Sequence, residues 1–273
     1  MHEHAQQFPI VMMCRLLQVS RSGCYVAKNR APSLRSQEDV ALRMRIERLH
    51  EQQWRAPGII KTWHLLQAEG VVCGRNRVAR LRQIAGIEAR RTARFRKMRT
   101  YQKTEPPAAD LVKRDFTMKK PNRVWVGDMT HIATRKGPLH LAAFLDLCTR
   151  RVIGWATATS QTARLAVAAL QVGIEAQQPT GGLICHTDQG SQFASAMFRN
   201  HLRDHQIRPS MSRKGNCHDN AVAESFFSSL KNELTHHTMF DDQDSALAAI
   251  TEYIDVYYNQ QRLHQTLGYR TPA

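Results

Sequence analysis

The sequence predicts an α+β / α/β chain in two parts: a small all-helical region over residues 1–105, and a core with a five-stranded mixed sheet over residues 106–273. Three observations lead to this prediction. Apolar residues recur at helical spacing through the first part. The pair Pro106-Pro107 ends a strongly basic segment, because proline stops a helix. Beyond that pair, runs rich in β-branched and aromatic residues alternate with amphipathic segments.

The charge of the chain indicates a polyanionic partner. Lys and Arg number 39 against 23 Asp and Glu, a net charge of +16, in a sequence whose 42% hydrophobic content is that of a globular protein. Residues 1–105 hold a net charge of +13 and residues 106–273 only +3. A basic surface that merely improved solubility would not need this concentration, so double-stranded DNA is the expected partner.

The chain has no candidate membrane segment, because no apolar run approaches the roughly 20 residues that a bilayer requires. Its first seven residues also lack the pattern of a secretory signal. We therefore expect a cytoplasmic protein with free thiols and no zinc. The cysteine and histidine residues that could suggest zinc lack its ligand spacing. They are His2, His4, Cys14, Cys24 and the neighbouring pairs Cys185-His186 and Cys217-His218.

Two helical pairs are predicted before the basic segment. The first lies over residues 8–28, and a long solvated helix over residues 33–53 follows it. The second pair, residues 59–68 and 75–85, encloses a glycine-bounded turn, as in a helix-turn-helix. Its last helix would contact DNA through Arg75, Arg77, Arg80 and Arg82, while Val78, Leu81 and Ile84 pack inward. The alternative is a helical hairpin with a charged face. Residues 90–103 are interpreted as a basic linker.

The second part begins with three predicted strands, at residues 124–134, 139–147 and 152–159, joined by short turns and therefore antiparallel. The later elements are a helix at 162–177, a strand at 182–187, a helix at 191–205, a strand at 207–211, and helices at 219–235 and 243–258. The order βββαβαβα is that of a ribonuclease-H-like fold.

Two aspartates stand where this fold would bring strands together. Asp128 lies in the middle of the first strand, where a carboxylate is costly unless it is paired or binds metal. Asp188 follows the fourth strand, and it could alternatively cap a turn. If the first and fourth strands are adjacent, the two carboxylates face each other. Such a site suits two Mg²⁺ ions, which Mn²⁺ could replace, acting on a phosphodiester.

Helix phase selects the third acid. At about 100° per residue, Lys231 shares the face of Glu224, whereas Glu233 points to the opposite side. Glu224 therefore joins the two aspartates as a candidate catalytic and metal-binding residue, and Lys231 is a candidate DNA contact. The alternative is that both are ordinary surface charges. Asp146 and Asp219 are interpreted as a turn residue and a helix cap.

Asp128 and Asp188 are separated by 59 residues, Glu224 follows after 35 more, and Lys231 lies seven positions further on. This spacing resembles the DDE signature of retroviral-integrase-like transposases. The surrounding sequences resemble the OrfB-type branch of insertion-sequence transposases. They are VWVGDMT at 124–130, LDLCTRRVIGW at 145–155, HTDQGSQF at 186–193 and DNAVAESFF at 219–227. One departure is Gly127, where this branch more commonly has Thr or Ala.

The resemblance implies a transposase whose Asp128, Asp188 and Glu224 hold the metals while a 3'-hydroxyl of the element attacks target DNA. It also implies a homo-oligomer on the element ends and target, and a possible partner from an upstream overlapping frame. Two alternatives stay open. One is a structure-selective or RNA–DNA nuclease, which would cut without joining. The other is a DNA-binding repressor or inactive remnant that uses only the basic helices.

Overall fold

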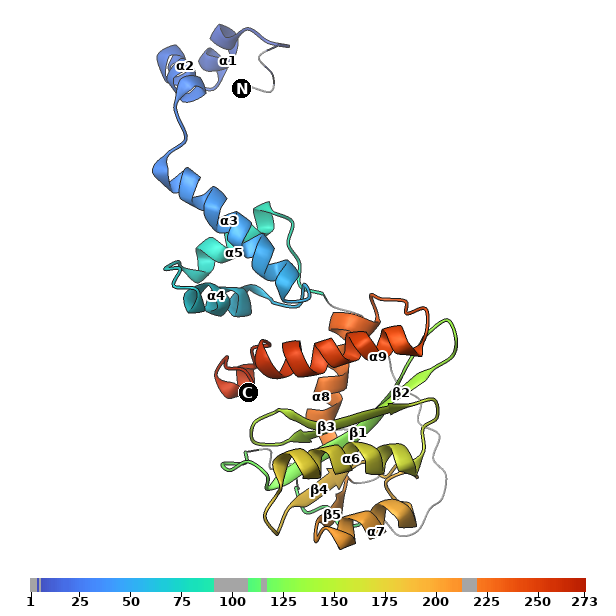
Figure 1. The fold of residues 1–273 in the computed structure, drawn as a ribbon. Helices are drawn as coiled ribbons and strands as arrows, with labels where there is room; N and C mark the ends of the chain where they lie inside the picture. Colours follow the sequence, from blue (N-terminus) through green and yellow to red (C-terminus); the bar gives the residue numbers. More distant parts are fainter. Residues whose placement is uncertain (1–3, 5, 91–107, 114–116, 213–219) are drawn as a thin grey trace.

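The computed structural model describes residues 4, 6–90, 108–113, 117–212 and 220–273. Most of the predicted basic linker, and Cys217, His218 and Asp219, lie outside these ranges. The helices before residue 90 are α1 (Ile10–Leu16), α2 (Arg21–Asn29), α3 (Leu34–Gln52), α4 (Ile59–Ala68) and α5 (Arg75–Ile84) (Figure 1). They match the predicted helices to within a few residues. No helix within the described ranges combines the length and apolar character that crossing a bilayer requires.

Helices α3, α4 and α5 share a small hydrophobic core, and α1 and α2 lie apart from it (Figure 1). Ile46 of α3, Leu66 of α4 and Val78 of α5 have no exposed surface. Leu81 is buried as predicted, but Ile84 is 59% exposed, so the prediction that it packs inward is wrong. It fails because α5 ends at Ile84, beyond the part of the helix that faces α3 and α4.

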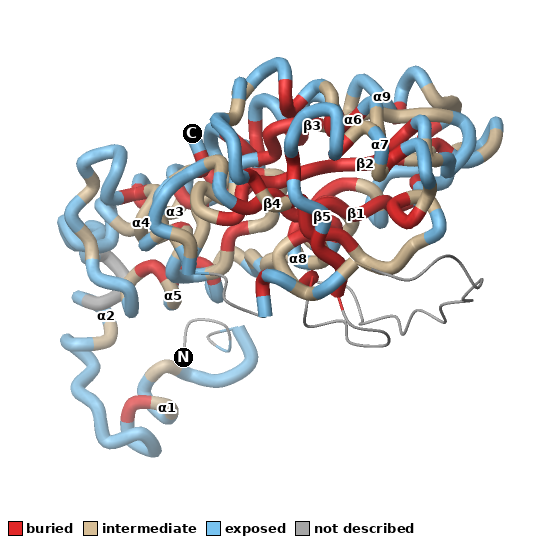
Figure 2. The backbone as a smooth tube through the Cα atoms, turned by 90° about the horizontal axis from the view of Figure 1, so that it is seen from below, coloured by how far each residue is buried: buried red, intermediate tan, exposed pale blue. Residues whose placement is uncertain are grey.

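The second part contains the predicted five-stranded mixed sheet, with strand order β3-β2-β1-β4-β5. The strands are β1 (Val124–Ile132), β2 (Leu139–Asp146), β3 (Val152–Ala158), β4 (Ile184–Thr187) and β5 (Arg208–Met211). The first three pair antiparallel, whereas β4 pairs parallel to both β1 and β5. Figure 2 shows that the central strands are largely buried, as expected for a sheet that is covered on both faces.

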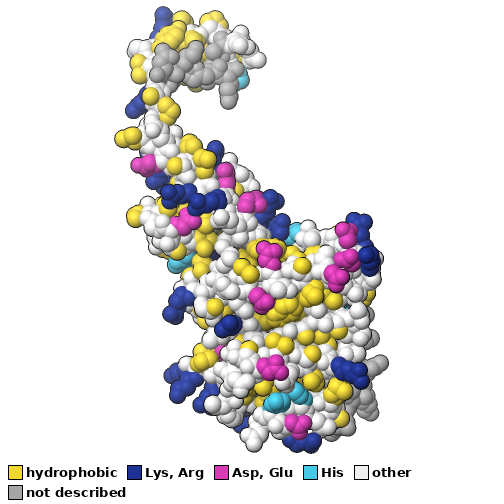
Figure 3. Space-filling model, in the orientation of Figure 1, with side chains coloured by type: hydrophobic (Ala, Val, Ile, Leu, Met, Phe, Trp, Pro, Cys, Tyr) yellow, Lys and Arg dark blue, Asp and Glu magenta, His cyan; other side chains and the backbone are white. Residues whose placement is uncertain are grey.

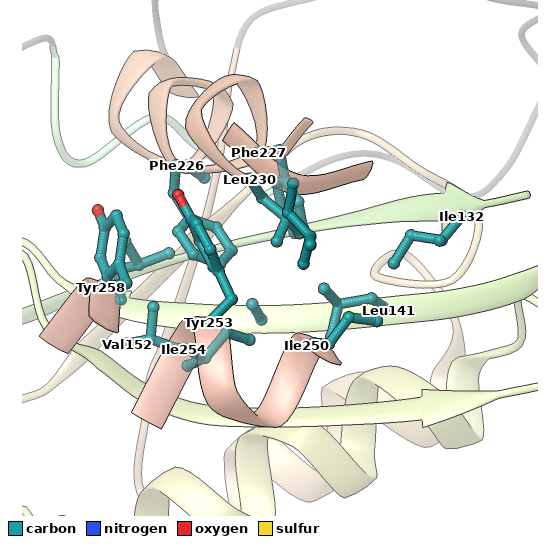
Figure 4. Packing of buried hydrophobic residues seen from close by; sticks show 14 of the residues in the cluster. Ile132, Leu141, Val152, Phe226, Phe227, Leu230, Ile250, Tyr253, Ile254 and Tyr258 are labelled. Carbon is teal, nitrogen blue, oxygen red and sulfur yellow. The ribbon is translucent and has the colours of Figure 1, made fainter. Parts of the chain in front are cut away.

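Helices cover both faces of this sheet because successive strand residues point to opposite sides. Trp125 and Phe144 face α6 (Ala163–Gln177) and α7 (Ala196–Asp204), in one hydrophobic cluster. Val126 and Ala143 belong to the other cluster, with α8 (Ala221–Leu230) and α9 (Gln243–Thr251). Figure 4 shows side chains of this second cluster, among them Phe226 of α8, packed between the helices and the sheet. The ribonuclease-H-like core is thus a three-layer structure.

The last helices differ from the prediction in one respect. Helix α8 continues as a π-helix, η2 (Lys231–Thr235), and α9 continues as a second π-helix, η3 (Glu252–Tyr258). The predicted helices at 219–235 and 243–258 are therefore present, but each changes its hydrogen-bond period before it ends. A short 3₁₀ turn, η4 (Gln265–Leu267), follows near the C-terminus. π-Helical turns are rare and often occur at functional sites.

Candidate active site

Asp128 occupies the middle of β1 and is only 6% exposed. It lies opposite Ala143 of β2, on the face of the sheet that α8 covers. Its Oδ1 accepts a hydrogen bond of 2.8 Å from the backbone N–H of Met129. A carboxylate in such a setting is stabilised by donors or cations, because burial without them costs several kcal/mol (~2–7 for a polar group).

Asp188 follows directly after β4. The parallel pairing of β1 with β4 ends with Gly127 opposite Thr187, so the same register brings Asp188 to the level of Asp128. The predicted adjacency of the first and fourth strands is therefore confirmed. Asp188 is half-buried, and its Oδ1 accepts a hydrogen bond of 3.0 Å from the backbone N–H of Gly190. This turn contact orients the carboxylate at the carboxyl end of β4.

Glu224 is attached to the same strand through Asn220, a residue whose role the sequence did not reveal. The Nδ2 of buried Asn220 donates a hydrogen bond of 3.1 Å to the carbonyl of Gly127, next to Asp128. Glu224 lies one turn further along α8, on the same helix face, and is half-buried. Asn220 thereby brings the first turn of α8 beside the middle of β1.

His186, a second buried polar residue, lies in β4 two residues before Asp188 and forms a hydrogen bond that holds this strand in place. His186 has no exposed surface, and its Nδ1 lies 2.8 Å from the hydroxyl of Ser210 on β5. The backbone N–H of Leu111 donates to the same hydroxyl at 2.9 Å. Asp110 lies near the same ring, its Oδ1 4.0 Å from Nδ1 of His186. This network joins β4, β5 and the segment that enters the core; sequence reasoning had considered His186 only as a zinc ligand.

The chemistry of these residues fits a hard divalent cation. Asp128, Asp188 and Glu224 offer only carboxylate oxygens, the ligands that Mg²⁺ and Mn²⁺ prefer. The Oδ1 of Asn220, beside these carboxylates on α8, is buried and accepts no hydrogen bond from any described residue. Within the described ranges, no three His, Cys, Asp or Glu side chains already converge as a metal site.

Two further buried acids have other partners. Asp146 is 1% exposed and accepts hydrogen bonds from the backbone N–H groups of Cys148 and Thr149, so its role in the β2–β3 turn is confirmed. Glu233 is 6% exposed, and its carboxylate accepts hydrogen bonds from the guanidinium of Arg262 and the hydroxyl of Tyr253. Glu233 therefore already has an ion-pair partner, and its exclusion from the metal site stays a prediction.

The arginines predicted to contact DNA fall into different environments. Arg75 is exposed and lies 5.4 Å over the ring of Trp63, and Arg77 and Arg80 both pair with Asp39 of α3. Those two guanidinium groups hold the pKa of the Asp39 carboxyl below its usual range. In the face shown in Figure 3, basic and acidic side chains are accordingly interspersed over this region.

Arg82 requires a correction. Only 4% of it is exposed, and its Nη1 donates a hydrogen bond of 2.8 Å to the hydroxyl of Thr62 on α4. Burial lowers the pKa of its guanidinium. Arg82 therefore holds α5 against α4 and does not lie on the surface that was predicted to meet DNA. Lys231, the remaining predicted contact, is half-buried at the start of η2.

Comparison with known proteins identifies related sequences over nearly the whole chain. The integrase core domain family matches residues 118–217 and again residues 205–272, and an HTH-like domain family matches residues 37–95. The insertion element IS600 31 kDa protein of Shigella sonnei is 38% identical over 261 residues, which are 96% of each chain. The transposase InsF of insertion sequence IS3fB from Escherichia coli is 34% identical over 99% of this chain and 94% of its own.

Among solved structures, the chain is similar to a chain of the simian T-cell lymphotropic virus intasome in complex with the PP2A regulatory subunit B56 gamma. The identity is 18%, the TM-score is 0.48, and the match covers 77% of this chain and 72% of the other. The sequence matches identify the family by themselves, since they extend over nearly the whole chain at more than 30% identity. The chain belongs to the IS3-type insertion-sequence transposases, DDE polynucleotidyl transferases built on an integrase core.

Proposed function

We propose that this transposase cleaves and joins DNA strands at the ends of an insertion element with Asp128, Asp188 and Glu224 as its catalytic, metal-binding carboxylates. The observation that supports this assignment most strongly is the register of β1 and β4, which sets Asp128 and Asp188 at one level of the sheet. The hydrogen bond from Asn220 to Gly127 brings the first turn of α8, the helix that contains Glu224, close to the same part of β1.

The three carboxylates would hold Mg²⁺, or Mn²⁺ in its place. When bound, the metal supplies an activated attacking oxygen and neutralises charge on the scissile phosphate. Asp128 is positioned by its strand and by the N–H of Met129, and Asp188 by the N–H of Gly190. Asn220 keeps Glu224 near both aspartates. Lys231, seven residues beyond Glu224, would hold a neighbouring DNA phosphate.

The same proposal assigns DNA binding to residues 1–105 and the chemistry to residues 106–273. Arg75, Arg77 and Arg80 on α5 would contact phosphates, with Asp39 as an intramolecular competitor for two of them. Transposition joins two element ends to one target, so we also propose that copies of the chain act together on DNA. A product of an upstream frame could contribute to that complex.

Substitution of the three acids tests the assignment. We expect Asp128→Asn, Asp188→Asn and Glu224→Gln each to lower strand cleavage and joining at least about 10³-fold in Mg²⁺, because metal catalysis contributes several kcal/mol. DNA affinity should stay within about twofold of the parent. Asp241→Asn, an acid on the exposed surface that pairs with Arg135, is the matched control and should retain activity.

Three outcomes would contradict the proposal. Joining that survives in any of the three variants would remove that residue from the site. Cleavage without joining in the parent protein would indicate a nuclease. DNA binding with no cleavage in either Mg²⁺ or Mn²⁺ would indicate a repressor or an inactive remnant.

A further inference from the structure

The far end of α8 is held by one guanidinium group from the C-terminal segment. Arg262 donates hydrogen bonds of 2.8–3.1 Å from Nε and Nη2 to the carboxylate of Glu233. Its Nη2 also donates to the hydroxyl of Ser229 at 2.9 Å. Ser229 belongs to α8 and Glu233 to η2, so a single side chain joins the last turn of the α-helix to the π-helical turn.

Lys231 stands between these two anchors, two residues after Ser229 and two before Glu233, and it is the first residue of η2. At about 100° per residue, two residues separate nearly opposite sides of a helix. Arg262 therefore holds one side of the helix, while Lys231 projects from the other, the side of Glu224. Because the hydrogen-bond period changes at Lys231, the direction of its side chain depends on where the wider turn begins.

Contacts from outside the helix hold this wider turn in place. π-Helical turns are rare and often occur at functional sites. Glu233 is 6% exposed, and its carboxylate also accepts a hydrogen bond of 2.7 Å from the hydroxyl of Tyr253. Its backbone carbonyl, one of the last in the helix, accepts a hydrogen bond of 3.0 Å from Nη1 of Arg90. Both the side chain and the backbone of Glu233 are thus fixed by partners that lie far away in the sequence.

Arg262 is itself attached to the sheet. Its side chain is 13% exposed, and its guanidinium lies 5.6 Å over the ring of Tyr258. Its backbone N–H donates to the carbonyl of Tyr257 at 2.8 Å. Asn259, three residues earlier, forms two hydrogen bonds of 3.0 Å with the backbone of Val152 at the start of β3. The guanidinium can therefore set the position of the helix that it contacts.

We propose that Arg262 is a positioning residue for Lys231, which fixes the junction of α8 and η2 so that the Lys231 ammonium group reaches a DNA phosphate beside the carboxylates. The inference rests on the proposed function, which assigns that contact to Lys231. Asn220 attaches the first turn of α8 to β1, and Arg262 fixes the far end of the same helix. The segment that contains Glu224 and Lys231 is then held at both ends.

The test is a double-mutant cycle in the full chain. Affinity for a fluorescent DNA duplex is measured over a series of NaCl concentrations for the parent, Lys231→Met, Arg262→Lys and the double variant. Lys231→Met should lower the slope of log K against log salt by about 0.9, the loss of one phosphate contact. Arg262→Lys retains the charge but lacks the planar fork that binds Glu233 and Ser229 together. It should lower the slope by a similar amount, and the double variant should fall no further than either.

Ser229 offers a milder change, in case Arg262→Lys folds poorly. Ser229→Ala removes only the hydroxyl that accepts from Arg262, so it should weaken DNA binding about threefold, the effect of one modest hydrogen bond. Ser229→Thr retains a hydroxyl and should bind DNA like the parent. In the Lys231→Met background, Ser229→Ala should have no further effect on affinity.

Arg82→Lys is the matched control, because Arg82 is another buried arginine that binds a hydroxyl, that of Thr62 on α4. Thermal unfolding without DNA measures the effect of each substitution on stability. Both arginine variants should lower the melting temperature. Any effect of Arg82→Lys on binding should add to that of Lys231→Met, since Arg82 lies in the helical region. If Arg262→Lys is likewise additive with Lys231→Met, then Arg262 only stabilises the fold, and the proposal is overturned.

Failure of the proposed function would give a different result. If Lys231→Met keeps the slope and the joining rate of the parent, the assignment of Lys231 to DNA fails, and the role of Arg262 fails with it. If Lys231→Met lowers the slope while Arg262→Lys and Ser229→Ala both keep it, only the positioning role is wrong. If the slopes follow the expected cycle but the parent neither cleaves nor joins DNA, the proposed function is wrong and the positioning of Lys231 stands.

Discussion

At the residue scale, the acids in the core differ in what neutralises them. Asp146 is held by turn amides and Glu233 by Arg262, so each is satisfied by its own chain. Asp128 and Asp188 lie at the level where β4 ends, and each accepts a hydrogen bond from a nearby backbone N–H group. Buried acids that structural donors saturate are poor metal ligands, so Asp146 and Glu233 are the less suitable candidates.

Asn220 is predicted to act as a positioning residue. Asn220→Ala removes the hydrogen bond to the carbonyl of Gly127, so the first turn of α8 loses its attachment to β1. We expect strand joining to fall about tenfold, because a buried hydrogen bond of this kind contributes about 1.4 kcal/mol. The measurement is single-turnover joining in Mg²⁺ over a range of metal concentrations.

A displaced Glu224 should also raise the metal concentration needed for half-maximal rate. Asn232→Ala is a suitable control, since Asn232 also lies on this helical segment and donates to Ser228. A variant Asn220→Ala with the parent rate and the parent metal dependence would show that the contact has no part in the reaction.

At the element scale, the pairing of β1 with β2 explains the unusual residue before Asp128. Gly127 lies opposite Phe144, and a Cβ at Gly127 would come within 2.2 Å of the Phe144 ring. The ring is fully buried and stacks with Phe198, so it has no free direction in which to move. Gly127 and Phe144 therefore form a complementary pair, in which the large side chain fills the space that the small one leaves.

Gly127→Ala is expected to lower the free energy of unfolding by about 1–3 kcal/mol, the range for overpacking a core. Gly127→Ala combined with Phe144→Leu should recover a substantial part of that loss, because the smaller side chain makes room for the new methyl group. Urea unfolding of the parent, both single variants and the double variant gives the coupling energy. Additive losses would contradict the pairing.

The π-helical segments belong to the same scale. Glu233 lies in η2 and Tyr253 in η3, and the hydroxyl of Tyr253 donates to the Glu233 carboxylate at 2.7 Å. Apolar periodicity predicts a helix at these positions but cannot tell a four-residue from a five-residue hydrogen-bond period over one turn. The contact between the two segments is a property of the packed core.

At the scale of the whole molecule, aromatic contacts attach the helical region to the core. The ring of Trp54 lies 5.8 Å from that of Tyr253, nearly perpendicular to it, and 6.0 Å from that of Tyr257. The hydroxyl of Tyr257 donates to the carbonyl of Gln53 at 3.3 Å. Trp54 and Arg55 both have left-handed backbone conformations, with φ of 55° and 56°. Such conformations cost free energy in non-glycine residues and persist where packing compensates.

Trp54→Ala should therefore weaken this attachment. Because Trp54 is half-buried, we expect a loss smaller than the roughly 3–5 kcal/mol of fully buried Trp to Ala changes. We also expect two resolved calorimetric transitions where the parent has one. Trp54→Phe keeps part of the ring contact, so its free energy of unfolding should lie between those of the parent and of Trp54→Ala. A single transition with an unchanged melting temperature in Trp54→Ala would mean that the contact does not couple the two parts of the chain.

Local patterns in the sequence were sufficient for the order of helices and strands, because helix and strand periods depend on neighbouring residues. The adjacency of β1 and β4 was an assumption taken from the fold class, and the structure confirms it. Only the tertiary structure decided the rest. It buried Arg82 against Thr62 and joined Asn220 to Gly127. These pairs lie apart along the chain, and burial and hydrogen bonding between such residues arise only when packing brings them together.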